Sequence, residues 1–353
     1  MYKFKTKPFE HQKDALKKCW NKKSFAVFAE MGTGKTKIAL DNACILYGKG
    51  SIDRLLVVAP KGTYMNWVDQ EIPVHVPDYI EKEVLAWKPS TSEKYKLQLK
   101  SIRSADDFRL KIFVMNVEAL STKKGVDAAR LFLIGKSMMI IDESTTIKNP
   151  QAKRTKNILE LSKGAKYRRI LTGSPVTQSP MDLWSQMDFL DPEILGQQSF
   201  YAFRTKYAVL ITASAAGGTH KFQKIVKFKN LKELGKLVSP HSYRILKKDC
   251  LDLPEKTFTK RTVELSEEQK KAYDEMKSSA ITILKGQSST AVNVLTQLIR
   301  LHQITCGHMK TDSGEVINLK SSRLDELMQI LAENTGKVII WANYIHDILN
   351  IEK

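Results

Sequence analysis

The sequence has few cysteines and no long apolar run. Its four cysteines, Cys19, Cys44, Cys250 and Cys306, are far apart and form no C-x-x-C pair, so their spacing favours neither a zinc site nor a disulfide framework. No uncharged apolar stretch reaches the roughly 18 residues that a membrane-spanning helix needs, and the N-terminal segment lacks the apolar core of a signal peptide. We therefore expect a protein of a reducing cytoplasm without a membrane partner.

Acidic residues are scarce relative to basic ones. The 353 residues include 57 Lys and Arg but only 38 Asp and Glu, which gives a formal net charge of +19. Such a surplus attracts polyanions, and without a membrane signal the leading expectation is nucleic acid. A basic surface with no dedicated partner is the alternative. Residues 203–261 alone contain 14 Lys and Arg against four Asp and Glu, and this density favours a surface that faces a polyanion.

Short apolar runs alternate with helical patterns over the first part of the chain. Near-continuous apolar runs are typical of parallel strands that are covered on both faces. The alternation predicts an α/β lobe, a parallel sheet with helices on both faces, over residues 1–195. Strands are predicted at 25–28, 55–59, 84–87, 111–115, 138–141 and 169–171, and helices at 36–47, 64–71 and 155–161.

The rest of the chain has a different character. Residues 196–256 are predicted to form a basic connecting region, with a glycine turn at 215–218 between two short strands. Residues 257–353 then read as the N-terminal part of a second α/β lobe that lacks its end, in agreement with the two domains expected from the length. Its helices are predicted at 266–284, 290–305 and 322–333, and a strand at 337–341.

A glycine-rich motif, AEMGTGKT (29–36), follows the first predicted strand and leads into a helix. In this context the motif is a P-loop, which turns successive backbone N–H groups and a helix N-terminus toward phosphate oxygens. Lys35 would reach the β- and γ-phosphates and the Thr36 hydroxyl would ligate Mg²⁺. The predicted nucleotide-contacting residues of the loop are Met31, Gly32, Thr33, Gly34, Lys35 and Thr36.

An acidic pair ends the predicted strand at 138–141. Asp142 would hold Mg²⁺, directly or through water, and Glu143 would position the attacking water. An Asp-Glu pair by itself is usually a surface feature, but its place at the end of an apolar strand after a P-loop favours a function. We therefore predict Lys35, Asp142 and Glu143 as the catalytic residues.

Ordered motifs along nearly the whole chain resemble one known family. They are KPFEHQ (7–12), AEMGTGKT (29–36), LLVVAPKGTYMNW (55–67), IIDESTTIKN (140–149) and LTGSPVTQSPMDLWSQMDFL (171–190), followed by the blocks 243–256, 298–306 and 337–342. This series resembles the Swi/Snf-type ATPases of helicase superfamily 2. The resemblance implies a RecA-like P-loop NTPase lobe followed by a partial second RecA-like lobe, ATP and Mg²⁺ as cofactors, and double-stranded DNA as the partner.

The resemblance also implies roles for residues outside the P-loop. Gln12 would read the adenine edge, with Phe9 packed on the base. Lys61, Thr63 and Asn116 would contact the nucleic-acid backbone.

A further set would link the nucleotide site to nucleic-acid binding, namely Thr145, Thr172 and Ser174. Thr145 stands where the family has the His of Asp-Glu-Ala-His, and a threonine cannot carry the positive charge of a histidine. Trp67, Trp184 and Phe189 look like packing residues.

The family's later motifs supply arginine fingers that stabilise charge on the γ-phosphoryl group. No candidate follows Arg323, so we expect a fragment of a longer protein, or a finger supplied by a partner, and weak activity of the chain by itself. The short loops suggest a bacterial or bacteriophage protein, located in the cytoplasm of a bacterial cell or a phage-infected host. A monomer is expected.

The leading functional hypothesis is an ATP-dependent translocase, a helicase-like motor that holds double-stranded DNA through phosphate contacts. The alternative is a nucleotide-regulated module that binds DNA or protein with little turnover. A P-loop kinase or metabolic NTPase is disfavoured, because no small-substrate site is evident and the acidic pair is followed by Thr-Gly-Ser at 172–174.

Overall fold

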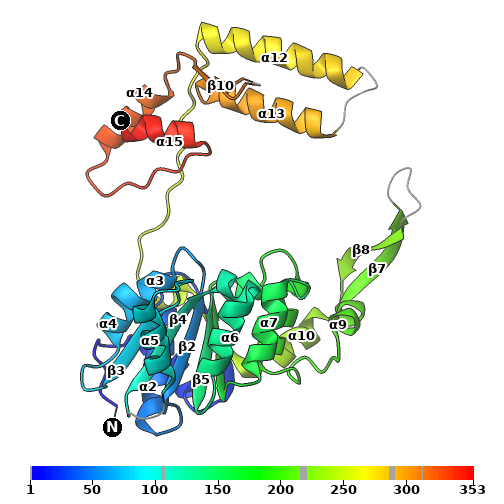
Figure 1. Ribbon diagram of the computed structural model, residues 1–353. Coiled ribbons are helices and arrows are strands. Elements are labelled where there is room, and N and C mark those ends of the chain that lie inside the picture. Colours follow the sequence, from blue (N-terminus) through cyan, green and yellow to red (C-terminus); the bar gives the residue numbers. More distant parts are fainter. Residues whose placement is uncertain (1, 105–107, 215–220, 286–290, 312) are drawn as a thin grey trace. The chain divides into compact units, whose positions relative to one another are not determined.

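The computed structural model describes residues 2–104, 108–214, 221–285, 291–311 and 313–353 (Figure 1). The chain separates into two compact units, unit 1 (Met1–Pro254) and unit 2 (Glu255–Lys353). The division predicted from the sequence, with boundaries after residues 195 and 256, stays a prediction. The predicted turn at 215–218 lies outside the described residues.

Unit 1 is built on a seven-stranded, wholly parallel sheet with the strand order β3-β4-β2-β5-β6-β1-β9. The six strands predicted in residues 1–195 are all present, within a residue or two of their predicted ends. The unpredicted strand is β9, which comes from the basic segment and pairs with β1. The strands are β1 (Ser24–Ala29), β2 (Arg54–Ala59), β3 (Lys82–Ala86), β4 (Leu110–Asn116), β5 (Ser137–Asp142), β6 (Tyr167–Thr172) and β9 (Ser242–Ile245).

Helices cover both faces of this sheet. Phe25 and Val27 of β1 belong to one hydrophobic core with residues of α1 and α2. Ala26 and Phe28 belong to the other, with residues of α6, α7 and α8. Successive residues of a strand point to opposite faces, so near-continuous apolar strands fill both cores. The helices are α1 (Glu10–Cys19), α2 (Lys35–Gly48), α3 (Tyr64–Asn66), α4 (Ile72–His75), α5 (Glu93–Arg103), α6 (Lys123–Phe132), α7 (Lys153–Ser162) and α8 (Leu183–Leu190).

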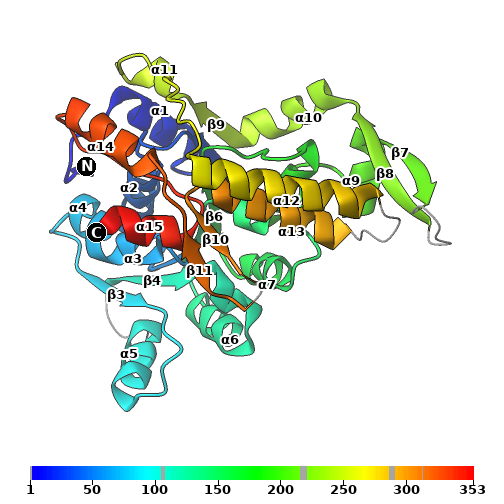
Figure 2. The same cartoon turned by 90° about the horizontal axis from the view of Figure 1, so that it is seen from above.

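A two-stranded hairpin extends from unit 1 beside α9 and α10, as both views show (Figures 1 and 2). Its strands run antiparallel, with a register shift between Val209 and Leu210. Strand β8 carries Lys221, Lys224 and Lys227, and neither strand contains an acidic residue. The segment comprises α9 (Phe200–Tyr207), β7 (Ala208–Ser214), β8 (Lys221–Phe228), α10 (Leu231–Val238) and, after β9, α11 (Lys247–Cys250).

Unit 2 contains four helices and a short hairpin among its described residues: α12 (Glu267–Lys285), α13 (Ala291–Thr305), β10 (His308–Lys310), β11 (Val316–Asn318), α14 (Arg323–Glu333) and α15 (Ile345–Glu352). The predicted strand at 337–341 is wrong: this segment is irregular, and Trp341 is 90% exposed. A strand requires a neighbour to pair its N–H and C=O groups, and no described residue pairs with this segment in a sheet.

Candidate nucleotide site

The P-loop connects the end of β1 to the start of α2. Gly32 and Gly34 have φ angles of +84° and +80°, a left-handed conformation that glycine adopts without steric cost. Helix α2 begins at Lys35, and its N-cap residue Gly34 has no side chain to cap it. The first N–H groups of α2 are therefore available to an anion, which is the arrangement that binds phosphate.

Lys35 and Glu143 come together although they are 108 residues apart. The Lys35 ammonium forms an ion pair with Glu143 Oε1. On the other side, Thr172 Oγ1 at the end of β6 donates to Glu143 Oε2 over 3.4 Å. Glu143 has a φ of +47°, which is unusual for a residue with a Cβ and is found where surrounding structure holds a functional side chain in place. The structure thus brings the start of α2 together with the ends of β5 and β6.

Asp142 lies one residue earlier and is buried. Its Oδ1 accepts a hydrogen bond from the Glu143 N–H, and its Oδ2 accepts one from the Trp67 indole, each at 3.0 Å. Burial raises the pKa of Asp142 above its usual range, while the Trp67 hydrogen bond and the Lys35 charge act in the opposite direction. Trp67, predicted only as a packing residue, therefore also contacts the predicted metal ligand.

No sequence signal connects Trp67 with Asp142. The indole reaches the carboxylate from a π-helical turn, Trp67–Glu71, inserted between α3 and α4. Single π-helical turns often occur at functional sites. Glu71 of the same turn also lies near the site: burial and then the Asp142 charge raise the pKa of its carboxyl.

The residues fit a magnesium ion held together with a nucleotide. Thr36 and Asp142 offer hard oxygen ligands, which Mg²⁺ prefers. Among the described residues no group of three or more His, Cys, Asp and Glu could hold a metal ion. Mg²⁺ commonly binds through one or two protein oxygens plus substrate phosphates, so this sparse ligand set is consistent with a metal that arrives with ATP.

Gln12 and Phe9 lie beside the P-loop. Gln12 is 3% exposed; its Oε1 accepts from the Phe9 N–H at 3.0 Å and its Nε2 donates to the Thr33 carbonyl at 3.2 Å. A Cβ on Gly34 would lie 2.2 Å from Gln12 Nε2, so glycine is required there for close approach as well as for φ. Phe9 is exposed and stacks on the His11 ring. The contact of Gln12 with adenine stays a prediction.

The predicted nucleic-acid contacts lie at the same edge of the sheet. Lys61 and Thr63 follow β2 and are exposed. Asn116 ends β4 opposite Ala59 of β2, and its Oδ1 accepts a hydrogen bond from the Ala119 N–H at 3.1 Å. This side chain therefore caps the following turn, and its role as a backbone contact stays a prediction.

The predicted coupling residues are arranged unequally. Thr172 Oγ1 contacts Glu143 and also accepts from the Ser174 N–H at 3.2 Å. Ser174 itself is exposed. Asp182 holds the following loop by accepting from the N–H and hydroxyl of Thr177 and from the Gln178 N–H, each at 2.9 Å. Within the described part of the chain, the Thr145 side chain makes no hydrogen bond.

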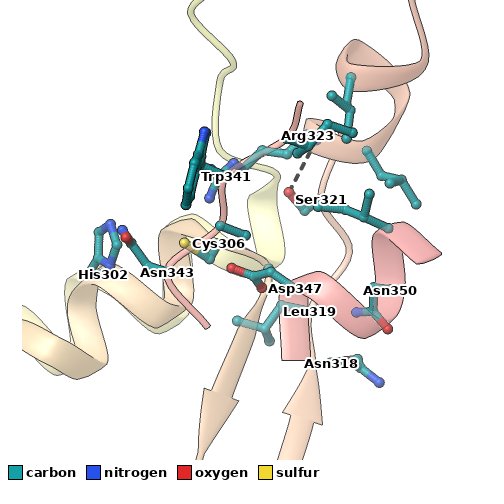
Figure 3. Close-up of a pocket in the computed structure, with 16 residues that line it drawn as sticks. His302, Cys306, Asn318, Leu319, Ser321, Arg323, Trp341, Asn343, Asp347 and Asn350 are labelled. Carbon is teal, nitrogen blue, oxygen red and sulfur yellow. Dashed lines mark hydrogen bonds between the residues drawn. The ribbon is translucent and has the colours of Figure 1, made fainter. Parts of the chain in front are cut away.

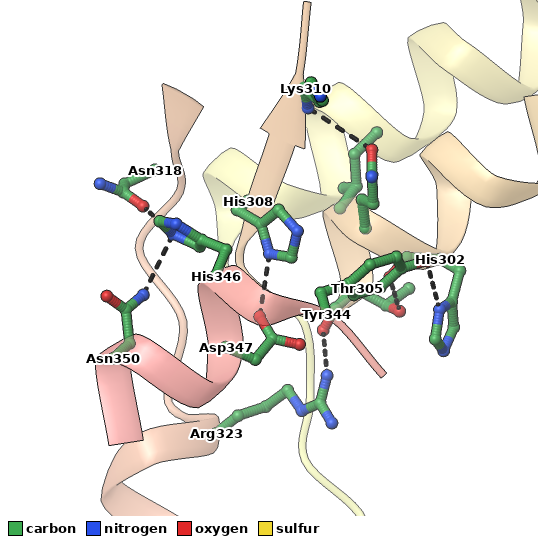
Figure 4. A network of polar contacts seen from close by, with 12 residues as sticks. His302, Thr305, His308, Lys310, Asn318, Arg323, Tyr344, His346, Asp347 and Asn350 are labelled. Carbon is green, nitrogen blue, oxygen red and sulfur yellow. Dashed lines mark hydrogen bonds and ion pairs between the residues drawn. The ribbon is translucent and has the colours of Figure 1, made fainter. Parts of the chain in front are cut away.

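A separate cavity of about 430 Å³ lies in unit 2 (Figure 3). Its lining includes Arg323 and Trp341, and none of the predicted site residues belongs to it. Beside it, His308 lies 3.0 Å from Asp347 through Nδ1 and Oδ1 (Figure 4). Burial lowers the pKa of His308, more than the Asp347 charge raises it.

No helix of the described residues is both long and apolar enough to cross a membrane.

Solved structures provide the first comparison. The chain is 24% identical to the "Sulfolobus solfataricus SWI2/SNF2 ATPase core in complex with dsDNA", with a TM-score of 0.54 over 94% of this chain and 65% of that one. A second structure, the Sulfolobus solfataricus SWI2/SNF2 ATPase core domain, has a TM-score of 0.51 and 25% sequence identity, over 86% of this chain and 58% of that one. The predicted α/β, RecA-like fold is confirmed.

Curated relatives provide the second. Protein CHROMATIN REMODELING 4 of Arabidopsis thaliana is 24% identical over 98% of this chain and 16% of its own length. The helicase-like transcription factor of Mus musculus is 27% identical over 81% of the chain and 27% of that protein. An uncharacterized ATP-dependent helicase of Mycoplasma genitalium is 25% identical over 92% and 28%. The chain thus spans less than a third of the length of each of these relatives. The SNF2-related domain family matches residues 11–310, and the chain therefore belongs to this family.

Proposed function

We propose that this chain is the core of an ATP-hydrolysing motor that moves along double-stranded DNA through phosphate contacts. The observation that carries the proposal is the convergence of the P-loop, Asp142 and Glu143 at one edge of the sheet. One structural neighbour, the Sulfolobus solfataricus ATPase core, was solved in complex with double-stranded DNA. The basic hairpin offers phosphate-binding side chains on the same unit.

In this proposal the P-loop N–H groups bind the phosphates. Lys35 leaves its ion pair with Glu143 and binds phosphate oxygens instead. Glu143, held by Thr172, then orients the attacking water. Thr36 and Asp142 would hold Mg²⁺, which when bound neutralises phosphate charge. Thr172 contacts both Glu143 and the N–H of Ser174. A movement of the 173–179 loop when nucleic acid binds would therefore change the position of Glu143.

The second candidate is a nucleotide-regulated binding module with little turnover. The observation in its favour is Thr145, whose side chain makes no hydrogen bond within the described residues although the coupling position of the family lies there. The origin in a bacterium or bacteriophage, the cytoplasmic location, the monomeric state, the weak activity of the chain alone and the missing arginine finger all stay predictions.

The Glu143→Gln variant separates the two candidates. For a motor we expect DNA-stimulated ATP hydrolysis by the wild-type chain, and a loss of about 10²-fold or more in the variant with nucleotide binding retained, because the amide keeps the shape but cannot act as a base. Hydrolysis is measured with duplex DNA, single strands, RNA or no nucleic acid. Hydrolysis that is indifferent to DNA, with nucleotide-dependent DNA affinity equal in both proteins, would reject the motor and support the module.

A further inference from the structure

The carboxyl ends of β1 and β9 lie side by side. The two strands are parallel, and Ala29 is paired with Ile245. Just beyond this pair the Glu30 N–H donates to the Ile245 carbonyl at 3.1 Å. The residues that follow β9 therefore run next to the residues that open the P-loop.

Lys247 is held against the P-loop through its backbone. Its N–H donates to Glu30 Oε2 at 2.7 Å, and its carbonyl accepts from the Leu251 N–H at 2.8 Å. Glu30 belongs to the motif AEMGTGKT, so one end of the P-loop and the start of α11 are joined by a side chain. This joint fixes the point from which the Lys247 side chain extends.

The Lys247 side chain extends over Gly32. A Cβ on Gly32 would lie 3.7 Å from Lys247 Cε and 3.9 Å from Nζ. In the described part of the chain no carboxylate forms an ion pair with this ammonium, whereas Lys35 is paired with Glu143. Lys247, a residue of intermediate exposure, thus places an ammonium group beside the P-loop, and no acidic side chain among the described residues forms an ion pair with it.

We propose that Lys247 is a second phosphate-binding lysine of the nucleotide site, supplied by the segment after β9. The proposal rests on the proposed nucleotide-binding function. A lysine suits this role because its ammonium is a compact point charge on a flexible stem that can follow phosphate oxygens. Lys247 contacts the polyphosphate and not the base, so it favours ADP and ATP over adenosine.

The contact has a consequence for the chain beyond the site. Lys247 precedes Glu255, where unit 2 begins, by only a few residues. Nucleotide held by Lys247 would therefore also hold the start of the segment that leads to unit 2.

The test is the affinity for ADP and for adenosine of three single variants, measured by competition with a fluorescent ADP analogue. Lys247→Met keeps the length of the side chain but removes its charge; we expect it to weaken ADP binding about tenfold or more, since it removes a charge-assisted contact, and to leave adenosine binding within about twofold. Lys248→Met, an equal change at the exposed neighbouring residue, is the matched control and should leave both affinities within about twofold. Lys247→Arg should restore most of the ADP affinity.

Lys35→Met separates failure of this proposal from failure of the proposed function. If Lys35→Met weakens ADP binding while Lys247→Met behaves like Lys248→Met, Lys247 is not a phosphate ligand and the nucleotide site stands. Equal loss of ADP and adenosine affinity in Lys247→Met would assign Lys247 a structural role and overturn the proposal. If the wild-type chain binds no nucleotide, the proposed function fails and this proposal fails with it.

Discussion

Asp142, the predicted metal ligand, has surroundings that act on its charge in opposite directions. Burial raises its pKa, which opposes the charged form that a metal requires. The indole N–H of Trp67 acts against this shift by hydrogen bonding to the carboxylate. The Trp67 hydrogen bond therefore favours the ionised form of Asp142, and we predict that it also positions this carboxylate.

Trp67→Phe tests this role. The variant removes a hydrogen bond to a charged acceptor, a loss of about 1.5–3 kcal/mol, and the pKa of Asp142 should rise further. We expect the acidic limb of the pH profile of ATP hydrolysis to move to higher pH. Trp184→Phe, at a buried tryptophan that packs against Phe203, is the control for lost indole volume. An unmoved acidic limb in Trp67→Phe would show that the indole only packs.

Asp142→Asn tests the cost of burying the carboxylate. Because its folded-state pKa is raised, Asp142 lowers stability as the pH rises through that pKa, and the destabilisation persists at neutral pH. The neutral amide removes this titration, although its NH2 group must face one of the two donors, the Glu143 N–H or the Trp67 indole. The Tm of the variant relative to the wild type should therefore be higher at about pH 7.5 than at about pH 4, while Mg²⁺-dependent hydrolysis is lost. Thermal unfolding at the two pH values is the measurement. Asp69→Asn, at an exposed residue of the turn that carries Trp67, should change Tm little at either pH. A Tm difference between Asp142→Asn and the wild type that does not increase from about pH 4 to about pH 7.5 would contradict the argument.

At the scale of elements, the β7–β8 hairpin carries three lysines on strands that do not belong to the seven-stranded sheet. Its lysines lie on a ribbon that is largely exposed, and its base packs on unit 1 through Ile225 and Phe228. The base fixes the ribbon to the lobe, and Lys221, Lys224 and Lys227 are exposed on it. Phosphate contacts made there would be insensitive to sequence and sensitive to salt.

Replacing Lys221, Lys224 and Lys227 by Gln tests the hairpin. We expect weaker binding to duplex DNA of any sequence, and a slope of log K against log salt that is smaller by about 1 for each lysine that contacts a phosphate. ADP affinity should be unchanged. The matched control replaces three exposed lysines of α5, Lys94, Lys96 and Lys100. Equal loss of DNA affinity in both triple variants would show that net charge alone matters.

At the scale of the whole chain, residues 251–266 connect the two units without helix or strand, and most of them are exposed. Arg261 within this stretch forms ion pairs with Glu326 and Glu333 of α14. The part before Arg261 has fewer such contacts, and exposed irregular backbone is where proteases cut first.

Limited trypsin digestion should therefore cleave first after Lys256 or Lys260. Mass spectrometry of the products should reveal a resistant fragment close to unit 1, and this fragment should retain ADP binding, since the P-loop, Asp142, Glu143 and Lys247 all belong to unit 1. First cleavage within the strands of the sheet, or a fragment that does not bind ADP, would contradict the independence of unit 1.

Local sequence patterns were sufficient to predict the strands of the first lobe and the P-loop. Apolar runs located six strands of the parallel sheet, and the order of strand, glycine-rich turn and helix located the P-loop. These features depend on neighbours in the chain, where side-chain periodicity and backbone conformation decide the structure. The acidic pair at 142–143 was found for the same reason, because it ends an apolar strand.

Tertiary structure decided the contacts between distant segments. Three contacts join residues from separate elements: the ion pair of Lys35 with Glu143, the hydrogen bond from the Trp67 indole to Asp142, and the approach of Lys247 to Gly32. Strand β9 was not predicted from the sequence and is defined by its pairing with β1. The apolar run at 337–341 forms no strand because none of the described residues pairs with it. A sequence pattern indicates what a segment can form, but hydrogen-bond partners and burial depend on what the rest of the fold brings beside it.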